Sequence, residues 1–202
     1  MARGHREARE VALQFEIRQI ILASASPRRL ELLKQLAPEF EVVPSDVPET
    51  ELGDPWETAV GLALAKARAV AYRFFDEIVI GADTVVAYEE DGWHQLAKPE
   101  NEADARRMLR TLSNREHVVI TGIAVIAPEI QEATSDTTRV RFRQMSDAEI
   151  AKYVATGEPM DKAGGYAIQG GAKSFVERVE GSISNVVGLP LEVLGPILVR
   201  LR

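Results

Sequence analysis

The strongest constraint on the fold is an apolar run rich in β-branched residues at residues 117–127 (HVVITGIAVIA). A run of this composition strongly favours a β-strand. Shorter runs of the same kind occur at residues 19–23, 40–43 and 78–87. Segments with apolar residues at helical spacing separate several of these runs, and strands that alternate with helices indicate an α/β fold.

Turn and capping residues set the expected boundaries of the elements. Asp91-Gly92 predicts a hairpin that follows the strand at 78–87, so we expect parallel and antiparallel pairs in one mixed β-sheet. Four polar residues stand where helices are expected to begin and are predicted N-caps: Ser26, Asp54, Asn101 and Ser146. We also expect strands at 134–144 and 175–179, a mostly irregular glycine-rich segment at 158–172, and a C-terminal helix from residue 190.

The composition restricts the function classes. Lys and Arg number 24 and Asp and Glu 31, which gives a net charge of −7, whereas a non-specific binder of nucleic acid needs a basic surface. The absence of cysteine excludes disulfides, thiolate nucleophiles and zinc–thiolate sites, and it fits an intracellular protein. No apolar run approaches the roughly 18 residues of a membrane span. We therefore expect a cytoplasmic protein without a membrane or nucleic-acid-polymer partner.

The chain of 202 residues is expected to divide into two parts. In residues 1–18 glutamates interrupt the arginines, and the only apolar stretch is too short for the core of a signal peptide. We expect an N-terminal extension there, either a tail or a short helix on the domain, and we favour the tail. Residues 19–202 contain no repeat and no low-complexity linker, and they are expected to form a single domain.

The first candidate site is the segment SASPRR at 24–29, between a strand and a helix. Backbone N–H groups at a helix N-terminus favour anions, and guanidinium groups bind pairs of oxygen atoms. Arg28 and Arg29 also oppose the helix dipole, which favours acidic residues in the first turn. Residues that cost helix stability suggest a binding role. The alternative is a capped helix whose arginines are only solvated.

The second candidate is Asp83, which interrupts the apolar run at 78–87. A carboxylate in a buried strand is costly unless it is paired, bound to a metal or directed into a cleft. The alternative is an Asp that caps a turn, but the apolar sequence resumes directly at Val85. Glu49, from an acidic segment, could join Asp83 as a ligand of Mg²⁺ or Mn²⁺, because both ions prefer oxygen ligands. Glu49 is one of several acidic residues in this segment, so by its spacing alone it could also be a solvated carboxylate.

The third candidate is the glycine-rich segment at 161–171 (DKAGGYAIQGG). Glycines allow a backbone to approach a ligand closely. Gln169 would present an amide that donates and accepts hydrogen bonds toward the edge of a base. The segment is not a Walker loop, because no Gly-Lys-Ser/Thr sequence follows the glycines. A flexible turn without a ligand is the alternative.

These segments together resemble the Maf family of nucleotide pyrophosphatases, which is related in fold to the inosine triphosphate pyrophosphatases. Eight blocks carry the resemblance in order: LASASPRR at 22–29, Glu49, ALAKARA at 63–69, GADTVV at 81–86, AKP at 97–99, HVVITGIAV at 117–125, GEPMDKAGGYAIQG at 157–170 and NVVGLPL at 185–191. It implies a twisted mixed sheet with flanking helices and a central cleft, a catalytic domain over 19–202, and a homodimer. One departure is Asn114, where the family usually has glycine; Asn is the best substitute for Gly at a positive φ.

The resemblance also implies an activity, the hydrolysis of a nucleoside triphosphate to the monophosphate and pyrophosphate. Asp83 would activate water against the α-phosphate and, with Glu49, would hold Mg²⁺ or Mn²⁺. The residues implied to hold the polyphosphate are Ser24, Arg28, Arg29, Lys66 and Lys98.

Three positions resemble the subgroup of the family that acts on dTTP and UTP. These are Arg28 after Ser-Pro, Thr84 after the catalytic Asp, and Gln169 in Tyr-Ala-Ile-Gln; the resemblance implies that Thr84 and Gln169 line the base pocket. Two other interpretations are kept. One is an enzyme of the same fold that acts on 7-methyl-GTP or a modified nucleotide. The other is a nucleotide-binding regulator of cell division without turnover, which would not need a positioned base such as Asp83.

Overall fold

The computed structural model describes residues 18–201 and contains one mixed β-sheet. Its seven strands are β1 (Ile20–Leu22), β2 (Glu41–Val42), β3 (Ile78–Glu89), β4 (Trp93–Leu96), β5 (Glu116–Ala127), β6 (Ile130–Phe142) and β7 (Val176–Glu180). The strand order is β2-β1-β3-β5-β6-β7, and β4 pairs with β3. β1 is parallel to β2 and β3, whereas the other pairs are antiparallel. The predicted mixed α/β fold is confirmed.

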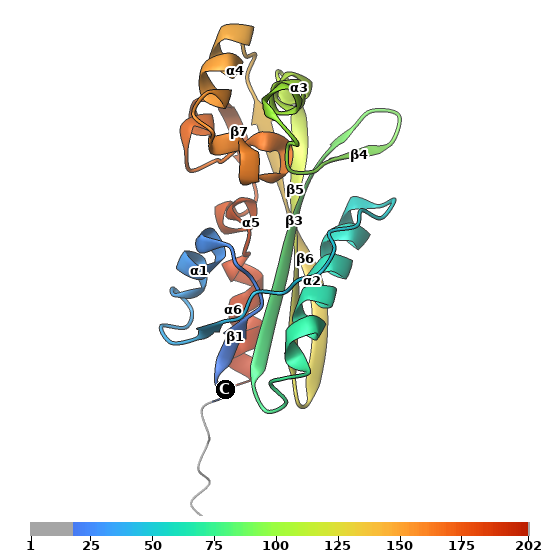
Figure 1. Cartoon of the computed structure of the whole chain (residues 1–202), viewed down its shortest axis with the longest axis vertical. Helices are drawn as coiled ribbons and strands as arrows, with labels where there is room; N and C mark the ends of the chain where they lie inside the picture. The colour runs from blue at the N-terminus through green and yellow to red at the C-terminus, as the bar shows by residue number, and fades with distance from the viewer. Residues whose placement is uncertain (1–17, 202) are drawn as a thin grey trace, which may run out of the picture.

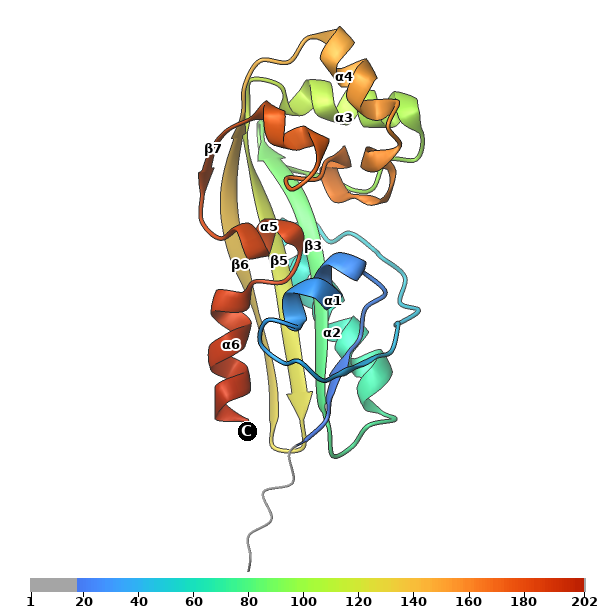
Figure 2. The same cartoon turned by 90° about the vertical axis from the view of Figure 1, so that its left-hand side faces the viewer.

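Helices cover both faces of the sheet and one end of it. They are α1 (Pro27–Leu33), α2 (Pro55–Ala71), α3 (Glu102–Leu112), α4 (Asp147–Val154), α5 (Ile183–Val187) and α6 (Leu191–Arg200). The long strands β3, β5 and β6 run the length of the molecule, with α2 on one face and α1, α5 and α6 on the other (Figures 1 and 2). Within residues 18–201 no helix is long and apolar enough to cross a membrane. The predicted extension at 1–18 lies outside the described residues except for Arg18.

The predicted helix caps are confirmed at three of four positions. The Asp54 carboxylate accepts hydrogen bonds from two backbone N–H groups of α2, Asn101 caps α3, and Ser146 forms a capping box with α4. The prediction for Ser26 is only half right. Ser26 occupies the N-cap position of α1, but its side chain makes no capping bond. Instead its backbone N–H donates to Ser24 Oγ at 3.2 Å, so the preceding serine orders this turn.

The structure differs from the sequence-based predictions at several elements. β6 begins at Ile130 instead of residue 134, because its polar first residues pair with β5 in a continuous antiparallel register. Residues 158–175, which include the glycine-rich segment at 161–171, contain three short 3₁₀ helices, η1 (Glu158–Asp161), η2 (Ala163–Gly165) and η3 (Gly171–Phe175). The short helix α5 was not predicted, because five residues are too few to show a helical period.

Two glycines in the sheet allow α2 to lie directly on β3 and β5. A Cβ atom at Gly122 would lie 2.1 Å from the carbonyl oxygen of Ala59, and one at Gly81 would lie 2.3 Å from that of Ala63. Backbone atoms of a helix cannot move aside singly, so any larger residue would displace the helix. This close contact fixes α2 against the strand that carries Asp83.

Buried His117 gives the fold a predictable dependence on pH. Its side chain is 2% exposed, its Nε2 lies 2.8 Å from the Tyr166 hydroxyl, and its ring packs edge-on against Phe142. Burial lowers the pKa of His117 to about 3, whereas the pKa in the unfolded chain is ~6.5. The unfolded chain therefore binds more protons between these two values, and stability is lost as the pH falls through this window.

We therefore expect His117→Gln to flatten the acid side of the stability profile. Between pH 7 and pH 4 the parent should lose on the order of 3 kcal/mol more unfolding free energy than the variant. Urea unfolding of both proteins at the two pH values measures this difference. Groups common to both proteins cancel in the comparison, so parallel profiles would show that His117 titrates normally in the folded state.

Candidate active site

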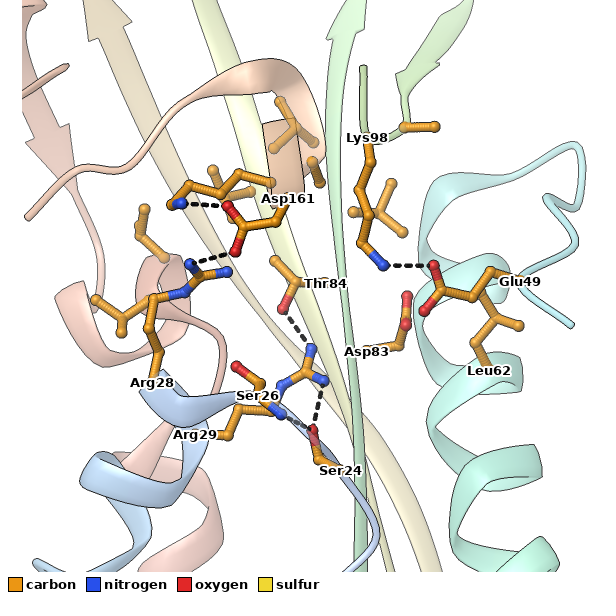
Figure 3. A pocket seen from close by; sticks show the side chains of 18 of the residues that line it. Ser24, Ser26, Arg28, Arg29, Glu49, Leu62, Asp83, Thr84, Lys98 and Asp161 are labelled. Carbon is orange, nitrogen blue, oxygen red and sulfur yellow. Dashed lines mark hydrogen bonds and ion pairs between the residues drawn. The ribbon is translucent and has the colours of Figure 1, made fainter. Parts of the chain in front are cut away.

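A cleft of about 630 Å³ lies between α1, α2, β3 and the glycine-rich segment (Figure 3). The predicted central cleft is therefore present. Every residue proposed for the site from the sequence lines it: Ser24, Arg28, Arg29, Glu49, Lys66, Asp83, Thr84, Lys98 and Gln169. These residues come from segments that are far apart in the chain, and the fold brings all of them to one cavity.

The carboxylates of Asp83 and Glu49 meet on the α2 side of β3. Lys66 Nζ donates to Asp83 Oδ1 at 2.6 Å and to Glu49 Oε1 at 2.8 Å. Lys98 Nζ donates to the other Glu49 oxygen at 2.8 Å. Asp83 and Lys66 are each 7% exposed, so this is a buried ion pair that opens only toward the cleft. Two carboxylates and two ammonium groups alternate along one wall.

The electrostatics of this wall keep Glu49 ionised. Burial alone would raise the pKa of Glu49, but hydrogen bonds from Lys66 and Lys98, together with their positive charges, lower that pKa to about 2. Glu49 belongs to a segment without regular secondary structure. The two lysines therefore fix a carboxylate whose own backbone provides little support.

The opposite wall of the cleft is organised around the guanidinium of Arg29. Its Nη1 donates to Ser24 Oγ at 3.3 Å and Nη2 donates to Thr84 Oγ1 at 3.1 Å (Figure 3). Its Nε donates to the carbonyl oxygen of Gly188 at 2.8 Å. Burial lowers the pKa of Arg29, and the two carboxylates of the cleft oppose that effect. Asp83 and Thr84 are successive residues of β3, so their side chains point to opposite faces of the strand. One strand thus presents a carboxylate to one wall and a hydroxyl to the other.

The mouth of the cleft is bordered by Arg28 and the glycine-rich segment. Arg28 Nη1 lies 3.6 Å from Asp161 Oδ2, and Lys162 pairs with the same carboxylate (Figure 3). Gln169 is exposed on the turn that follows and lines both this cleft and a second cavity of about 250 Å³ beside α1. Arg28 also lines this second cavity, whereas Asp83 and Glu49 line only the first.

Three residues of the site were not singled out from the sequence. Asp161 stands in the glycine-rich motif, which was the available signal. Gly188 contributes only its carbonyl oxygen, and Thr121, from β5, contacts the Thr84 hydroxyl at 3.0 Å. Thr121 and Gly188 lie in the blocks 117–125 and 185–191 of the family resemblance, but no local pattern marks their roles, because each acts through a contact with a distant segment.

The donor set of the cleft fits a hard divalent cation. Residues 18–201 contain no group of three His, Cys, Asp or Glu side chains placed to hold a metal ion. However, Asp83 and Glu49 both bind the same Lys66 ammonium group, so one cation already lies between them. Mg²⁺ is commonly held by one or two carboxylates, with phosphate and water oxygens as its other ligands. Two carboxylates in a cleft that also carries anion-binding groups satisfy this pattern.

Comparison with known proteins gives the family. The profile described as "Maf-like protein" matches residues 19–201. The chain belongs to the Maf family. Similar proteins named dTTP/UTP pyrophosphatase include one from Geotalea uraniireducens (strain Rf4), 52% identical over 176 residues, 85% of this chain and 89% of the relative. One from Koribacter versatilis (strain Ellin345) is 49% identical over 174 residues, which are 85% of this chain and 89% of the relative. One from Geobacillus sp. (strain WCH70) is 47% identical over 177 residues, which are 87% of this chain and 94% of the relative.

The departure from the family resemblance at Asn114 is accommodated locally. Asn114, in place of the usual glycine, has a φ of 53° and lies in the turn between α3 and β5. Asparagine tolerates this left-handed conformation better than most residues. The predicted positive φ is confirmed, and the substitution lies outside the residues that line the cleft.

Proposed function

We propose that this Maf protein hydrolyses dTTP and UTP to the nucleoside monophosphate and pyrophosphate. The observation that carries the proposal is the nearly buried Asp83 carboxylate, held in a cleft whose walls also present two arginines and two lysines. A carboxylate base beside several cations suits an electrophile that is a polyanion. The names of the relatives and the subgroup residues Arg28, Thr84 and Gln169 support the same substrates.

In the proposed reaction Asp83 accepts a proton from water as the water oxygen attacks the α-phosphorus. The bond from the α-phosphorus to the bridging oxygen breaks, and pyrophosphate leaves with the electron pair. Lys66, Lys98, Arg28 and Arg29 supply positive charge where the phosphate oxygens gain negative charge, and Ser24 adds a hydroxyl. A Mg²⁺ or Mn²⁺ ion held by Glu49 and Asp83 would supply further charge neutralisation when bound.

The nucleobase of the substrate is proposed to be recognised at the mouth of the cleft. Uracil and thymine present the O4 acceptor next to the N3–H donor. The amide of Gln169 matches both, since its NH₂ donates and its carbonyl oxygen accepts. Gln169 is exposed beside Arg28, on a turn that leaves the amide accessible to a ligand.

Gln169→Glu tests this specificity. The variant loses the donor and places a carboxylate against O4, so kcat/KM for UTP and dTTP should fall about 10-fold or more. Residual activity on purine triphosphates should change much less. Steady-state kinetics on UTP, dTTP and ATP measure both effects. Equal losses on all three nucleotides would show that Gln169 supports the loop or the phosphates and does not read the base.

A pyrophosphate-release assay with dTTP, UTP, CTP and 7-methyl-GTP tests the function as a whole. The proposal predicts turnover of dTTP and UTP, partial discrimination against CTP because an amide can flip, and little turnover of 7-methyl-GTP. Preference for 7-methyl-GTP would support the alternative enzyme. Binding of a triphosphate without any release of pyrophosphate would support a regulator.

The organisation of the whole chain remains part of the proposal. We infer a single catalytic domain over residues 19–202 with an N-terminal extension before it, a homodimer, and a cytoplasmic location. The family profile, which matches residues 19–201, supports the domain boundary. Size-exclusion chromatography with light scattering would determine the oligomeric state.

A further inference from the structure

A buried polar network lies directly behind the wall of the cleft that is organised around Arg29. Thr121, Thr138 and Asn185 are each 0% exposed. The Asn185 carboxamide oxygen accepts from the Thr121 N–H at 3.1 Å, and its Nδ2 donates to the Val119 carbonyl oxygen and to Thr138 Oγ1, both at 2.9 Å. A backbone N–H only donates and a carbonyl only accepts, so these partners fix the orientation of the amide.

This network fixes the direction of the proton on two hydroxyl groups. Thr121 Oγ1 lies 2.8 Å from the backbone carbonyl oxygen of Asn185. This oxygen can only accept, so Thr121 donates its single hydroxyl hydrogen to it. In the 3.0 Å contact between the two threonine hydroxyls, Thr84 must then be the donor. The Thr84 hydroxyl therefore presents only lone pairs to the cleft, and one of them accepts from Arg29 Nη2.

A second connection runs from Asn185 to the same guanidinium. The Gly188 N–H is shared between the backbone carbonyl oxygens of Asn185 and Ser184, each at 3.0 Å, and the Gly188 carbonyl oxygen accepts from Arg29 Nε at 2.8 Å. Gly188 has a φ of 121°, and a Cβ there would lie 3.3 Å from Thr84 Oγ1. The Asn185 backbone carbonyl oxygen thus helps to anchor two of the three acceptors that hold Arg29, one through Thr121 and Thr84 and the other through Gly188.

We propose that Thr121 is a positioning residue, which holds the Thr84 hydroxyl as a hydrogen-bond acceptor and thereby fixes Arg29 for binding the polyphosphate. This inference rests on the proposed function. A guanidinium held by three acceptors meets a phosphate without loss of side-chain freedom at that moment. Without the Thr121 hydroxyl the Thr84 proton is free to turn toward Arg29 Nη2, where it would oppose the guanidinium.

The test compares Thr121→Val with Thr138→Val. Both positions are buried threonines in the same network, and both variants keep the shape of the side chain and remove one hydroxyl. Thr138 Oγ1 donates to the carbonyl oxygen of Ser182 and accepts from Asn185 Nδ2. Within residues 18–201 no side-chain hydrogen bond joins it to Thr84 or Arg29. A purely structural role therefore predicts similar behaviour of the two variants, whereas a positioning role affects Thr121 alone. Thr121→Ser keeps the hydroxyl and serves as the conservative variant.

We expect Thr121→Val to raise KM for UTP and the inhibition constant of pyrophosphate by about 10-fold, the effect of one hydrogen bond to a charged group, with kcat changed much less. Thr138→Val should stay within about twofold of the parent in all three constants, and Thr121→Ser should return close to the parent. Equal constants in the two valine variants would overturn the proposal, as would a Thr121→Ser variant as weak as Thr121→Val.

Two further arms keep the result interpretable. If Thr121→Val does not fold, Thr121→Ala compared with Thr121→Ser gives the same contrast. If the parent does not hydrolyse UTP, the proposed function fails, but calorimetric titration of the parent and both valine variants with pyrophosphate still tests the positioning of Arg29. Unchanged pyrophosphate affinity in Thr121→Val would then contradict the proposal by itself.

Discussion

Asp83→Asn retains the fold and lowers the turnover of UTP by about 10²-fold or more, the usual scale for loss of a general base. The amide has the shape of the carboxylate and still accepts a hydrogen bond from Lys66, so the packing between α2 and β3 is preserved. It lacks the charge and the basicity needed to remove a proton from water. Steady-state kinetics and thermal unfolding of the purified variant measure the two parts of this prediction.

Asp76→Asn is the matched control, because Asp76 is exposed in the loop between α2 and β3 and does not line the cleft. Its turnover should equal that of the parent. If the turnover of UTP by Asp83→Asn is within a few-fold of that of the parent, Asp83 is not the general base. A variant that is inactive because it is unfolded would lack a thermal unfolding transition, and Asp83→Ser would then replace it.

Gly122→Ala has the largest expected effect on stability. Its new Cβ would lie 2.1 Å from the Ala59 carbonyl oxygen and 2.6 Å from the Val60 nitrogen, both backbone atoms of α2. Relief requires a shift of the whole helix, so the unfolding free energy should fall by about 3 kcal/mol or more. Urea unfolding measures this loss. Because α2 carries Lys66, folded Gly122→Ala protein should also show a raised KM for UTP.

Gly61→Ala is the control in the same helix. Its Cβ would meet only Leu52 Cδ1 at 3.6 Å, an ordinary van der Waals contact. Replacement of an exposed helical glycine by alanine should raise stability by roughly 0.5–1 kcal/mol. Equal stabilities of Gly122→Ala and Gly61→Ala would show that α2 does not pack on the sheet as closely as the structure has it.

The sequence predicts those features whose cause is local. Asp54, Asn101 and Ser146 cap helices through neighbouring backbone groups, and the placement of Asp83 inside an apolar strand is visible from its immediate neighbours. The cost of an unpaired carboxylate in a strand then predicts a partner, which the structure provides as Lys66. Interactions between neighbouring residues therefore suffice to predict most of the fold and the position of the buried carboxylate.

Features that depend on distant contacts were not accessible in this way. By its spacing alone Glu49 looked like one acid among several; the family resemblance singled it out, and its bonds to Lys66 and Lys98 give the physical reason. Thr121 reads as an ordinary β-branched strand residue, yet its hydroxyl connects β3 to α5. Such roles arise from the strand register and from the packing of α5, which no short window of sequence encodes.

The central claim is that water attacks the α-phosphorus of a pyrimidine nucleoside triphosphate, with Asp83 as the base. Hydrolysis of UTP in water enriched in ¹⁸O, followed by mass spectrometry of the products, tests it most directly. The account predicts that the label enters the phosphate of UMP and is absent from pyrophosphate, and that Asp83→Asn slows the appearance of labelled UMP by the factor given above. Label in pyrophosphate, or in orthophosphate with UDP as the second product, would contradict it.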